Sequence, residues 1–254
     1  MIMQDIFVED VGSGTPLVLV HGFLGSSDMW RPQIKFFKND YRVIVPALPG
    51  FGKSNTIKSC HTIECMAKLI LIFLEKKEIK KFNLLGHSMG GMIAQVMAKI
   101  AGEKILKLVC YGTGPRGDIP GRFETIDQSR KKLKIDGLKD TAYRIAKTWF
   151  IKEDKAEYFY LCNEAGKQTS IEAVDNGLVA MKNWDGVKNL QNIKNKTLIV
   201  WGDQDKAYNY SQVETLNNKI PNSDLKIIKG CSHNVHLEKP AEFNKIVKEF
   251  LRGA

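Results

Sequence analysis

The sequence predicts an α/β protein built around one mostly parallel sheet, with helices on both faces and a helical insertion. Six short apolar runs, rich in Val, Ile and Leu, have the length and composition of strands that are buried on both sides. They are residues 17–20, 42–45, 82–85, 106–109, 197–200 and 225–228. Helical patterns lie between several of these runs. Because parallel strands need crossover connections, this alternation favours helices on both faces of one sheet.

Helices are expected where apolar residues recur every three or four positions. This spacing predicts helices over residues 65–77, 92–104 and 243–251. Near the N-terminus, residues 4–11 are expected to form an antiparallel strand at the edge of the sheet, leading into the first buried strand.

One region interrupts the alternation of strands and helices. Between residues 115 and 185 no buried strand is predicted, and the sequence instead has helix-like stretches rich in Lys, Tyr and Trp. The turn-rich residues 112–121 open this region, and strand-like sequence resumes at Lys196. We therefore expect residues 1–114 and 186–254 to form the two parts of a core, and residues 115–185 to form a helical insertion.

The length and composition are those of an ordinary globular protein. The chain has 254 residues, of which 43% are hydrophobic and 26% charged, so it can bury a sizeable core. No apolar run approaches the roughly 18 residues of a membrane span, and the first residues lack a signal-peptide pattern. We expect a cytoplasmic protein, monomeric or homodimeric, without a membrane partner.

A formal charge of +10 raises the question of a nucleic-acid partner. The basic residues are mostly lysines spread along the chain, and no recognisable nucleic-acid motif accompanies them. A solvated surface accounts for this pattern, so no nucleic-acid partner is predicted. At most, the charge favours an anionic substrate.

The five cysteines support neither a zinc site nor a disulfide framework, because they are scattered and none forms a C-x-x-C pair. Cys60 and Cys65 could face each other on one helix, but we expect buried free thiols. Cys231 lies close to a histidine of the candidate site and is expected to be a bystander there. No metal and no cofactor are predicted.

Residues 84–91 read L-L-G-H-S-M-G-G, and they place one serine where an apolar run ends and a helical pattern begins. Gly86-x-Ser88-x-Gly90 fits the G-x-S-x-G pattern of a nucleophile on a tight strand-to-helix turn. Such a turn strains the backbone of the serine, and glycines two positions away avoid collisions. An ordinary helix N-cap would not need these glycines. Ser88 is therefore the predicted nucleophile.

A serine nucleophile needs a base, and the base needs an orienting carboxylate. Asp203 and Asp205 follow the apolar run at 197–200, and His233 and His236 follow the run at 225–228. Carboxyl ends of parallel strands form a common ligand crevice. We assign Asp205 and His233 to the triad. Asp203 is expected to stabilise a turn, and His236 to be structural.

An oxyanion hole needs two N–H donors near the nucleophile. One is expected from Met89, directly after Ser88. The glycine-bearing turn after residues 17–20 is a suitable second donor loop, with Phe23 the first choice for the N–H and Leu24 the next. His21 is expected to orient this loop, because no carboxylate or second histidine lies near it in sequence for a metal site.

These residues justify naming a family. The chain resembles the α/β-hydrolase superfamily over essentially its full length. The matching motifs are His21-Gly22-Phe23-Leu24-Gly25, Leu48-Pro49-Gly50-Phe51-Gly52-Lys53-Ser54, Gly86-His87-Ser88-Met89-Gly90-Gly91, Trp201-Gly202-x-x-Asp205 and His233-x-x-His236-Leu237-Glu238-Lys239-Pro240. The resemblance supports Asp205 and His233 as acid and base, and it implies that residues 115–185 form a cap over the active site. Ala47 departs from the Asp that relatives usually carry before Leu-Pro-Gly.

The resemblance implies serine chemistry, since relatives that open epoxides or remove halides use Asp as the nucleophile. Hydrolysis of a small-molecule carboxylic ester through an acyl-enzyme is the expected reaction. The substrate is expected to be anionic or to carry an apolar acyl group. Candidate substrate-contacting residues are Leu24, His87, Trp149 and Trp184.

Three alternative functions remain. The first is hydrolysis of a carbon–carbon bond in a vinylogous diketone from ring fission, with Arg116, Arg122 or Arg144 holding a substrate carboxylate. The second is a lyase like SHCHC synthase of the menaquinone pathway, which would need several arginines around its substrate, whereas the whole chain has seven. The third is a non-catalytic small-molecule receptor.

Overall fold

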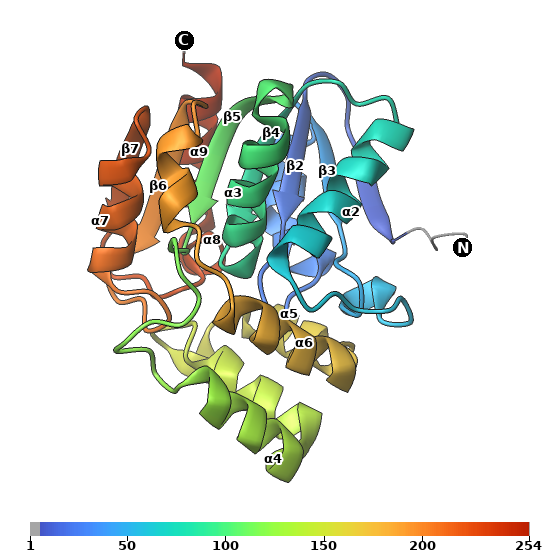
Figure 1. Ribbon diagram of the computed structural model, residues 1–254, viewed down its shortest axis with the longest axis vertical. Helices are drawn as coiled ribbons and strands as arrows, with labels where there is room; N and C mark the ends of the chain where they lie inside the picture. The colour runs from blue at the N-terminus through green and yellow to red at the C-terminus, as the bar shows by residue number, and fades with distance from the viewer. Residues whose placement is uncertain (1–5, 254) are drawn as a thin grey trace.

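The fold, given by a computed structural model that describes residues 6–253, is a single twisted sheet covered by helices (Figure 1). In this part of the chain the sheet has seven strands in the order β1-β3-β2-β4-β5-β6-β7. The strands are β1 (Val8–Val11), β2 (Pro16–Val20), β3 (Arg42–Pro46), β4 (Phe82–His87), β5 (Ile105–Tyr111), β6 (Thr197–Gly202) and β7 (Ser223–Ile228). All six predicted buried runs form strands, and they pair in parallel.

The edge strand β1 pairs with β3 and runs antiparallel to it, as the sequence predicts. Gln4 and Asp5, at the start of the predicted strand, lie outside the described residues. The central strands β2 and β4 are almost wholly buried, which explains why their sequences are continuous apolar runs without alternation.

Helices cover both faces of the sheet. They are α1 (Arg31–Phe37), α2 (Ile63–Lys76), α3 (Met89–Ala101), α4 (Ile126–Lys147), α5 (Phe159–Lys167), α6 (Ile171–Lys182), α7 (Tyr210–Lys219), α8 (Val235–Glu238) and α9 (Pro240–Arg252). Figure 1 shows α2, α3 and α7 in front of the sheet and α9 behind it. The two faces have separate apolar clusters, and α1 shares the second cluster with α9. The predicted doubly covered parallel sheet is confirmed.

Between residues 115 and 185 the chain leaves the sheet and returns. An isolated bridge joins Arg116 to Asp185, where the two ends of this segment meet. The segment contains α4, α5 and α6, which lie at the edge of the sheet toward which the parallel strands point (Figure 1). Gly137 interrupts α4 with φ 79° and ψ 178°. The division into a core and a cap remains a prediction, but helices do occupy the expected segment.

The expectation of free thiols at Cys60 and Cys65 is wrong, because these residues form a disulfide with their Cα atoms 5.9 Å apart. Cys60 precedes α2, whereas Cys65 lies in the first turn of that helix. The two residues are therefore not on one helix, and the turn between them brings the sulfurs together. Cys110, Cys162 and Cys231 are free and buried.

Much of the charge is engaged in ion pairs at the surface. Examples are Arg42 with Asp10 at 2.6 Å and Arg130 with Asp175 at 2.7 Å. Such partly exposed pairs contribute roughly 0–1 kcal/mol each to stability. Within residues 6–253 none of the helices combines the length and the apolar character that crossing a membrane requires.

The packing of α1 and α9 against the sheet can be tested with two neighbouring phenylalanines of α1. Phe37 is fully buried in its cluster, whereas its neighbour Phe36 is only partly buried. Phe37→Ala should lower the free energy of unfolding by about 3–5 kcal/mol, because it opens a cavity between the helices and the sheet. Phe36→Ala should cost about 1 kcal/mol. Urea unfolding followed by circular dichroism measures both, and equal losses would contradict this packing.

Candidate active site

Ser88 lies on a strained turn between β4 and α3. Its backbone has φ 54° and ψ −120°, a conformation that residues other than glycine rarely adopt. The flanking glycines are required by close contacts: a Cβ at Gly86 would lie 2.2 Å from the Gly90 carbonyl oxygen, and one at Gly90 would lie 2.3 Å from the Val20 carbonyl oxygen. The turn therefore can form only with glycine at both positions.

Hydrogen bonds hold this turn in place. The Ser88 amide donates to the Tyr111 carbonyl of β5 at 2.9 Å. The Ser88 carbonyl accepts from the Thr113 hydroxyl at 2.8 Å and from the Gly91 amide at 2.8 Å. These bonds offset the backbone strain, and they fix the serine at the carboxyl edge of the sheet.

His233 and Asp205 meet at the same edge. The Nδ1 atom of His233 lies 2.8 Å from Oδ2 of Asp205, and their side chains are only 2% and 0% exposed. The other carboxylate oxygen accepts hydrogen bonds from the Ala207 and Tyr208 amides at 2.7 and 3.1 Å. Because the buried carboxylate is satisfied in this way, it can orient the imidazole and leave Nε2 available for proton transfer.

The two alternative residues have other partners. Asp203 accepts a hydrogen bond from the Gly230 amide at 2.7 Å, which links the turns after β6 and β7. His236 lies 3.0 Å from the Tyr111 hydroxyl through its Nδ1 atom and is fully buried. Burial lowers the pKa of His236 to about 3, so it is neutral at physiological pH.

The imidazole of His233 is close to the turn at Ser88. Its ring centre is 4.6 Å from that of His87, the residue directly before Ser88. His87 is itself stacked on Tyr111, with ring centres 4.5 Å apart, and it is nearly inaccessible. Burial, followed by the nearby imidazoles of His233 and His236, holds the pKa of His87 well below its usual range.

The loop after β2 lies against Ser88. A Cβ at Gly22 would be only 2.9 Å from the Ser88 Cβ. The next residues are Phe23 and Leu24, and Leu24 is buried with φ 54°. The Nε2 atom of His21 accepts a hydrogen bond from the Leu48 amide at 3.0 Å, so this histidine ties the loop to the segment after β3. Burial lowers the pKa of His21 to about 4.

Two backbone amides at this place have no partner in the described part of the chain. They are the N–H groups of Phe23 and of Met89, the first residue of α3. The amide of an N-terminal helical residue cannot bond within its own helix, and the helix dipole favours negative charge there. Both groups are therefore available to an oxyanion.

Tyr208 is a residue of the site that the sequence analysis missed. Its ring is stacked on His233, with centres 5.8 Å apart and planes inclined by 24°. Burial raises the pKa of Tyr208 to about 12, while the Arg122 charge and a hydrogen bond with the Ser88 hydroxyl act in the opposite direction. The phenol therefore stays neutral beside Ser88. Its position three residues after Asp205 is the only signal that could have identified it.

The two candidate tryptophans lie in different places. The Trp149 ring centre is 6.1 Å from that of His233, and the Trp149 carbonyl accepts a hydrogen bond from the Asn234 amide at 3.0 Å. Trp184 instead packs against Gly186 and lines a separate pocket with residues of α2 and α3.

Other groups near the site are unreactive or engaged. Cys231 is buried, and burial raises the pKa of its thiol to about 12, so it is not a thiolate at neutral pH. Within residues 6–253 no group of three or more His, Cys, Asp or Glu side chains is arranged to hold a metal ion.

A hydrolase family and several known hydrolases are similar to this chain in sequence or structure. A sequence model of a family described as alpha/beta hydrolase fold matches residues 15–240. The chain is 28% identical to a 2-hydroxy-6-oxononadienedioate/2-hydroxy-6-oxononatrienedioate hydrolase of Burkholderia vietnamiensis, over 97% of this chain and 91% of that protein. It is 26% identical to a monoacylglycerol lipase of Rattus norvegicus, over 94% and 76% of the two chains. A thermophilic esterase from Thermogutta terrifontis superposes with a TM-score of 0.88 at 26% identity, covering 97% and 93% of the chains.

Because two buried histidines are neutral in the folded protein, we expect its stability to fall in acid. His21 and His236 are neutral in the folded protein down to about pH 4 and about pH 3, but in the unfolded chain they bind protons below about pH 6.5. Stability should therefore be complete above pH 6.5 and fall below it, by up to about 1.4 kcal/mol per histidine and pH unit. Urea unfolding at pH 7, 6 and 5 measures this slope. His236→Gln should reduce the change of unfolding free energy with pH by up to about 1.4 kcal/mol per pH unit, the contribution of one histidine. An unchanged slope would show that His236 does not contribute to the acid sensitivity.

Proposed function

Because the chain belongs to the alpha/beta hydrolase fold family, we propose that it is a serine hydrolase that cleaves a small-molecule carboxylic ester through an acyl-enzyme. The observation that carries the proposal is the buried hydrogen bond between Asp205 and His233 beside the strained turn of Ser88. A buried acid–imidazole pair next to a serine on such a turn is an arrangement suited to nucleophilic catalysis.

In the proposed mechanism, Nε2 of His233 takes the proton of the Ser88 hydroxyl while the serine oxygen attacks the ester carbonyl carbon. The N–H groups of Phe23 and Met89 stabilise the oxyanion of the tetrahedral intermediate. His233 then gives the proton to the departing alcohol, which leaves an acyl group on Ser88. Water, deprotonated by His233, attacks this acyl group, and the same steps release the acid and restore the serine. Asp205 stabilises the imidazolium ion that forms in each half of the reaction.

Similarity to an esterase structure and to a lipase supports the ester as the bond that is cleaved. Trp149 and Phe23 supply apolar surface on the side of residues 115–185: Phe23 lies 3.1 Å from where a Cβ at Gly177 of α6 would be, and Trp149 lies beside His233. An apolar acyl group fits such walls. We propose these two residues as contacts of the substrate, together with Leu24, which follows Phe23 in the loop after β2.

Hydrolysis of a carbon–carbon bond is the second candidate, because one relative is named as a hydrolase of an oxo-dienedioate. Two of the three arginines considered for a substrate carboxylate make ion pairs, Arg116 with Asp185 and Arg144 with Glu124. The third, Arg122, makes no ion pair among the described residues, and its charge reaches the Tyr208 phenol. Arg122 and Arg144 both have buried nitrogens without a hydrogen-bond partner there, so the position beside Tyr208 is what distinguishes Arg122. Arg122 is therefore the residue that would hold a carboxylate in this reaction.

The proposal includes a small-molecule substrate, no cofactor, and neither a nucleic acid nor a membrane as partner. It also places the enzyme in the cytoplasm, although the Cys60–Cys65 disulfide is more typical of an oxidising compartment. The basic surface is compatible with an anionic substrate, since it raises the local concentration of anions.

Removal of the nucleophile tests the reaction class. A panel of p-nitrophenyl esters with graded acyl chains should be hydrolysed by the wild-type protein, and Ser88→Ala should lower kcat/KM by about 10⁴-fold or more while the protein remains folded. A fluorophosphonate probe should label Ser88. Wild-type turnover in the variant, or labelling at Cys231, would exclude Ser88 as the nucleophile.

The same panel, run beside a ring-fission diketone, decides which bond is cleaved. A higher kcat/KM for the diketone than for the esters would assign the protein to carbon–carbon bond hydrolysis. The proposed role of Ser88 would be unaffected. Absence of turnover with both substrate classes, together with ligand-dependent binding of a partner protein, would indicate a receptor.

The acid of the triad can be tested with two matched variants. Asp205→Asn should lower kcat by about 10⁴-fold, because an amide no longer stabilises the imidazolium of His233. Asp203→Asn should change kcat less than about tenfold, since the Asp203 carboxylate bonds only to the Gly230 amide among the described residues. Steady-state kinetics on one ester measure both values. The reverse order would assign the role to Asp203.

A further inference from the structure

The chain around His233 is bonded to the turn that follows α4. The Asn234 amide donates to the Trp149 carbonyl at 3.0 Å, and the Ser232 hydroxyl donates to the Thr148 carbonyl at 3.2 Å. Ser232 and Asn234 are the two neighbours of His233 in the sequence, and all three residues are buried. The place of the imidazole therefore depends on the turn after α4.

One carboxylate joins these two segments directly. Glu238, the last residue of α8, accepts a hydrogen bond from the Ile151 amide through Oε1 at 2.7 Å and from the Ser232 amide through Oε2 at 2.6 Å. Charge-assisted bonds of this kind are stronger than bonds between neutral groups. The bond to Ser232 also closes a ring of the chain from residue 232 to residue 238, and His233 lies within this ring.

The type of residue at position 238 fits this double contact. A carboxylate presents two acceptor oxygens and no donor, whereas an amide of the same size presents one oxygen and one NH2 group. Burial raises the pKa of Glu238, and the Ile151 and Ser232 N–H groups act in the opposite direction. The two bonds therefore offset part of the cost of placing a charge in this half-buried position.

We propose that Glu238 is a positioning residue for His233, because its carboxylate fixes the segment that carries the imidazole against the turn after α4. The inference rests on the proposed function, in which His233 is the base. Proton transfer needs an exact orientation, and a displacement of about 1 Å can lower a rate by roughly 10²-fold. Ile151 lies two residues after Trp149, so one side chain holds both the proposed base and a proposed substrate contact in place.

Steady-state kinetics of Glu238→Gln on one p-nitrophenyl ester test this role. The amide oxygen can accept from only one of the two N–H groups, and the NH2 group faces the other, so kcat should fall by about tenfold or more. Glu242→Gln on α9 is the matched control. The exposed Glu242 carboxylate pairs with Lys239 at 3.8 Å, and its loss should leave kcat within about twofold of the wild-type value. An unchanged kcat in Glu238→Gln, or a change confined to KM, would overturn the proposal.

A second variant, Glu238→Asp, separates the double contact from the charge. Aspartate keeps the negative charge but is one methylene shorter, so it cannot reach both amides. Its kcat should again fall by about tenfold or more, with circular dichroism confirming that the variant is folded at the assay temperature. Wild-type kcat in folded Glu238→Asp would mean that the charge alone matters, and it would contradict the proposal.

Nuclear magnetic resonance gives a readout that needs no substrate. The signal of the proton that His233 Nδ1 shares with Asp205 Oδ2, across 2.8 Å, should shift or broaden in Glu238→Gln and stay unchanged in Glu242→Gln. If the wild-type protein hydrolyses no ester but this signal depends on Glu238, the ester proposal fails and the positioning of His233 is supported. Normal ester turnover, with the signal and kcat both unchanged in Glu238→Gln, would leave the proposed function standing and overturn this inference.

Discussion

The backbone turn at Ser88 is the constraint on which the centre of this molecule depends. A residue held at φ 54° and ψ −120° stores about 1–3 kcal/mol of strain and persists only when its surroundings determine it. The amide bond to Tyr111 joins the turn to β5, and the Thr113 hydroxyl joins it to the segment after β5. The turn also requires glycine at positions 86 and 90, because other chain segments come too close for any side chain. The entry into α3 and the place of the Ser88 side chain at the carboxyl edge of the sheet both follow from this one turn.

Polar groups at the carboxyl edge of the sheet are arranged before any substrate arrives. The Asp205 carboxylate accepts two backbone amides in addition to its bond to His233. The other histidines nearby are neutral, because burial lowers the pKa of His21 and His236. A site with satisfied charges and neutral neighbours needs little reorganisation when charge develops in a reaction, and this preorganisation is the main electrostatic contribution to catalysis.

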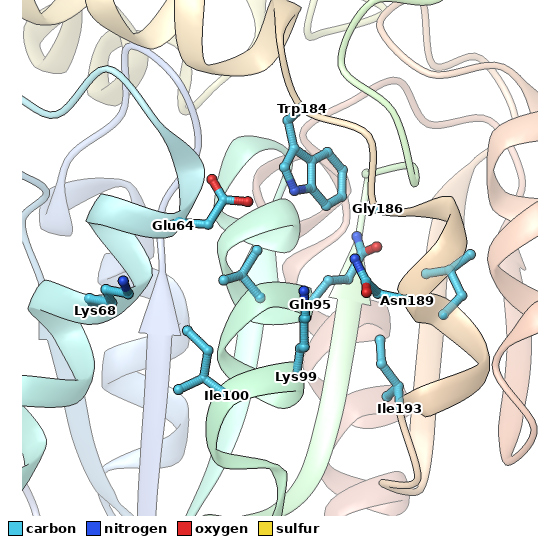
Figure 2. Close-up of a pocket in the computed structure, with 11 residues that line it drawn as sticks. Glu64, Lys68, Gln95, Lys99, Ile100, Trp184, Gly186, Asn189 and Ile193 are labelled. Atoms are coloured by element: carbon cyan, nitrogen blue, oxygen red, sulfur yellow. The ribbon is translucent and has the colours of Figure 1, made fainter.

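Gln95 of α3 and Trp184 line a pocket away from Ser88 (Figure 2). The Gln95 amide ties α3 to the Gly114 carbonyl through Nε2, and its Oε1 atom is buried without a hydrogen-bond partner among the described residues. Trp184, which the sequence analysis grouped with the substrate contacts, lines this pocket. Trp184 lies two residues beyond α6, and its place in the sequence does not tell which residues of other elements surround its indole. Tyr208 was missed for a similar reason, since its contacts with His233 and Ser88 join segments that are far apart in the chain.

The sequence by itself determined the positions of the strands along the chain and their mostly parallel direction, the helical character of residues 115–185, and the glycine–serine–glycine turn. These features depend on local steric limits and on short-range periodicity, which a single chain displays directly. Only the tertiary structure decided that Cys60 and Cys65 are bonded, that Tyr208 stacks on His233, and that the Gln95 amide bonds to the Gly114 carbonyl. Those features depend on how side chains from separate elements meet, and several partners were sterically possible until the sheet and its helices were assembled.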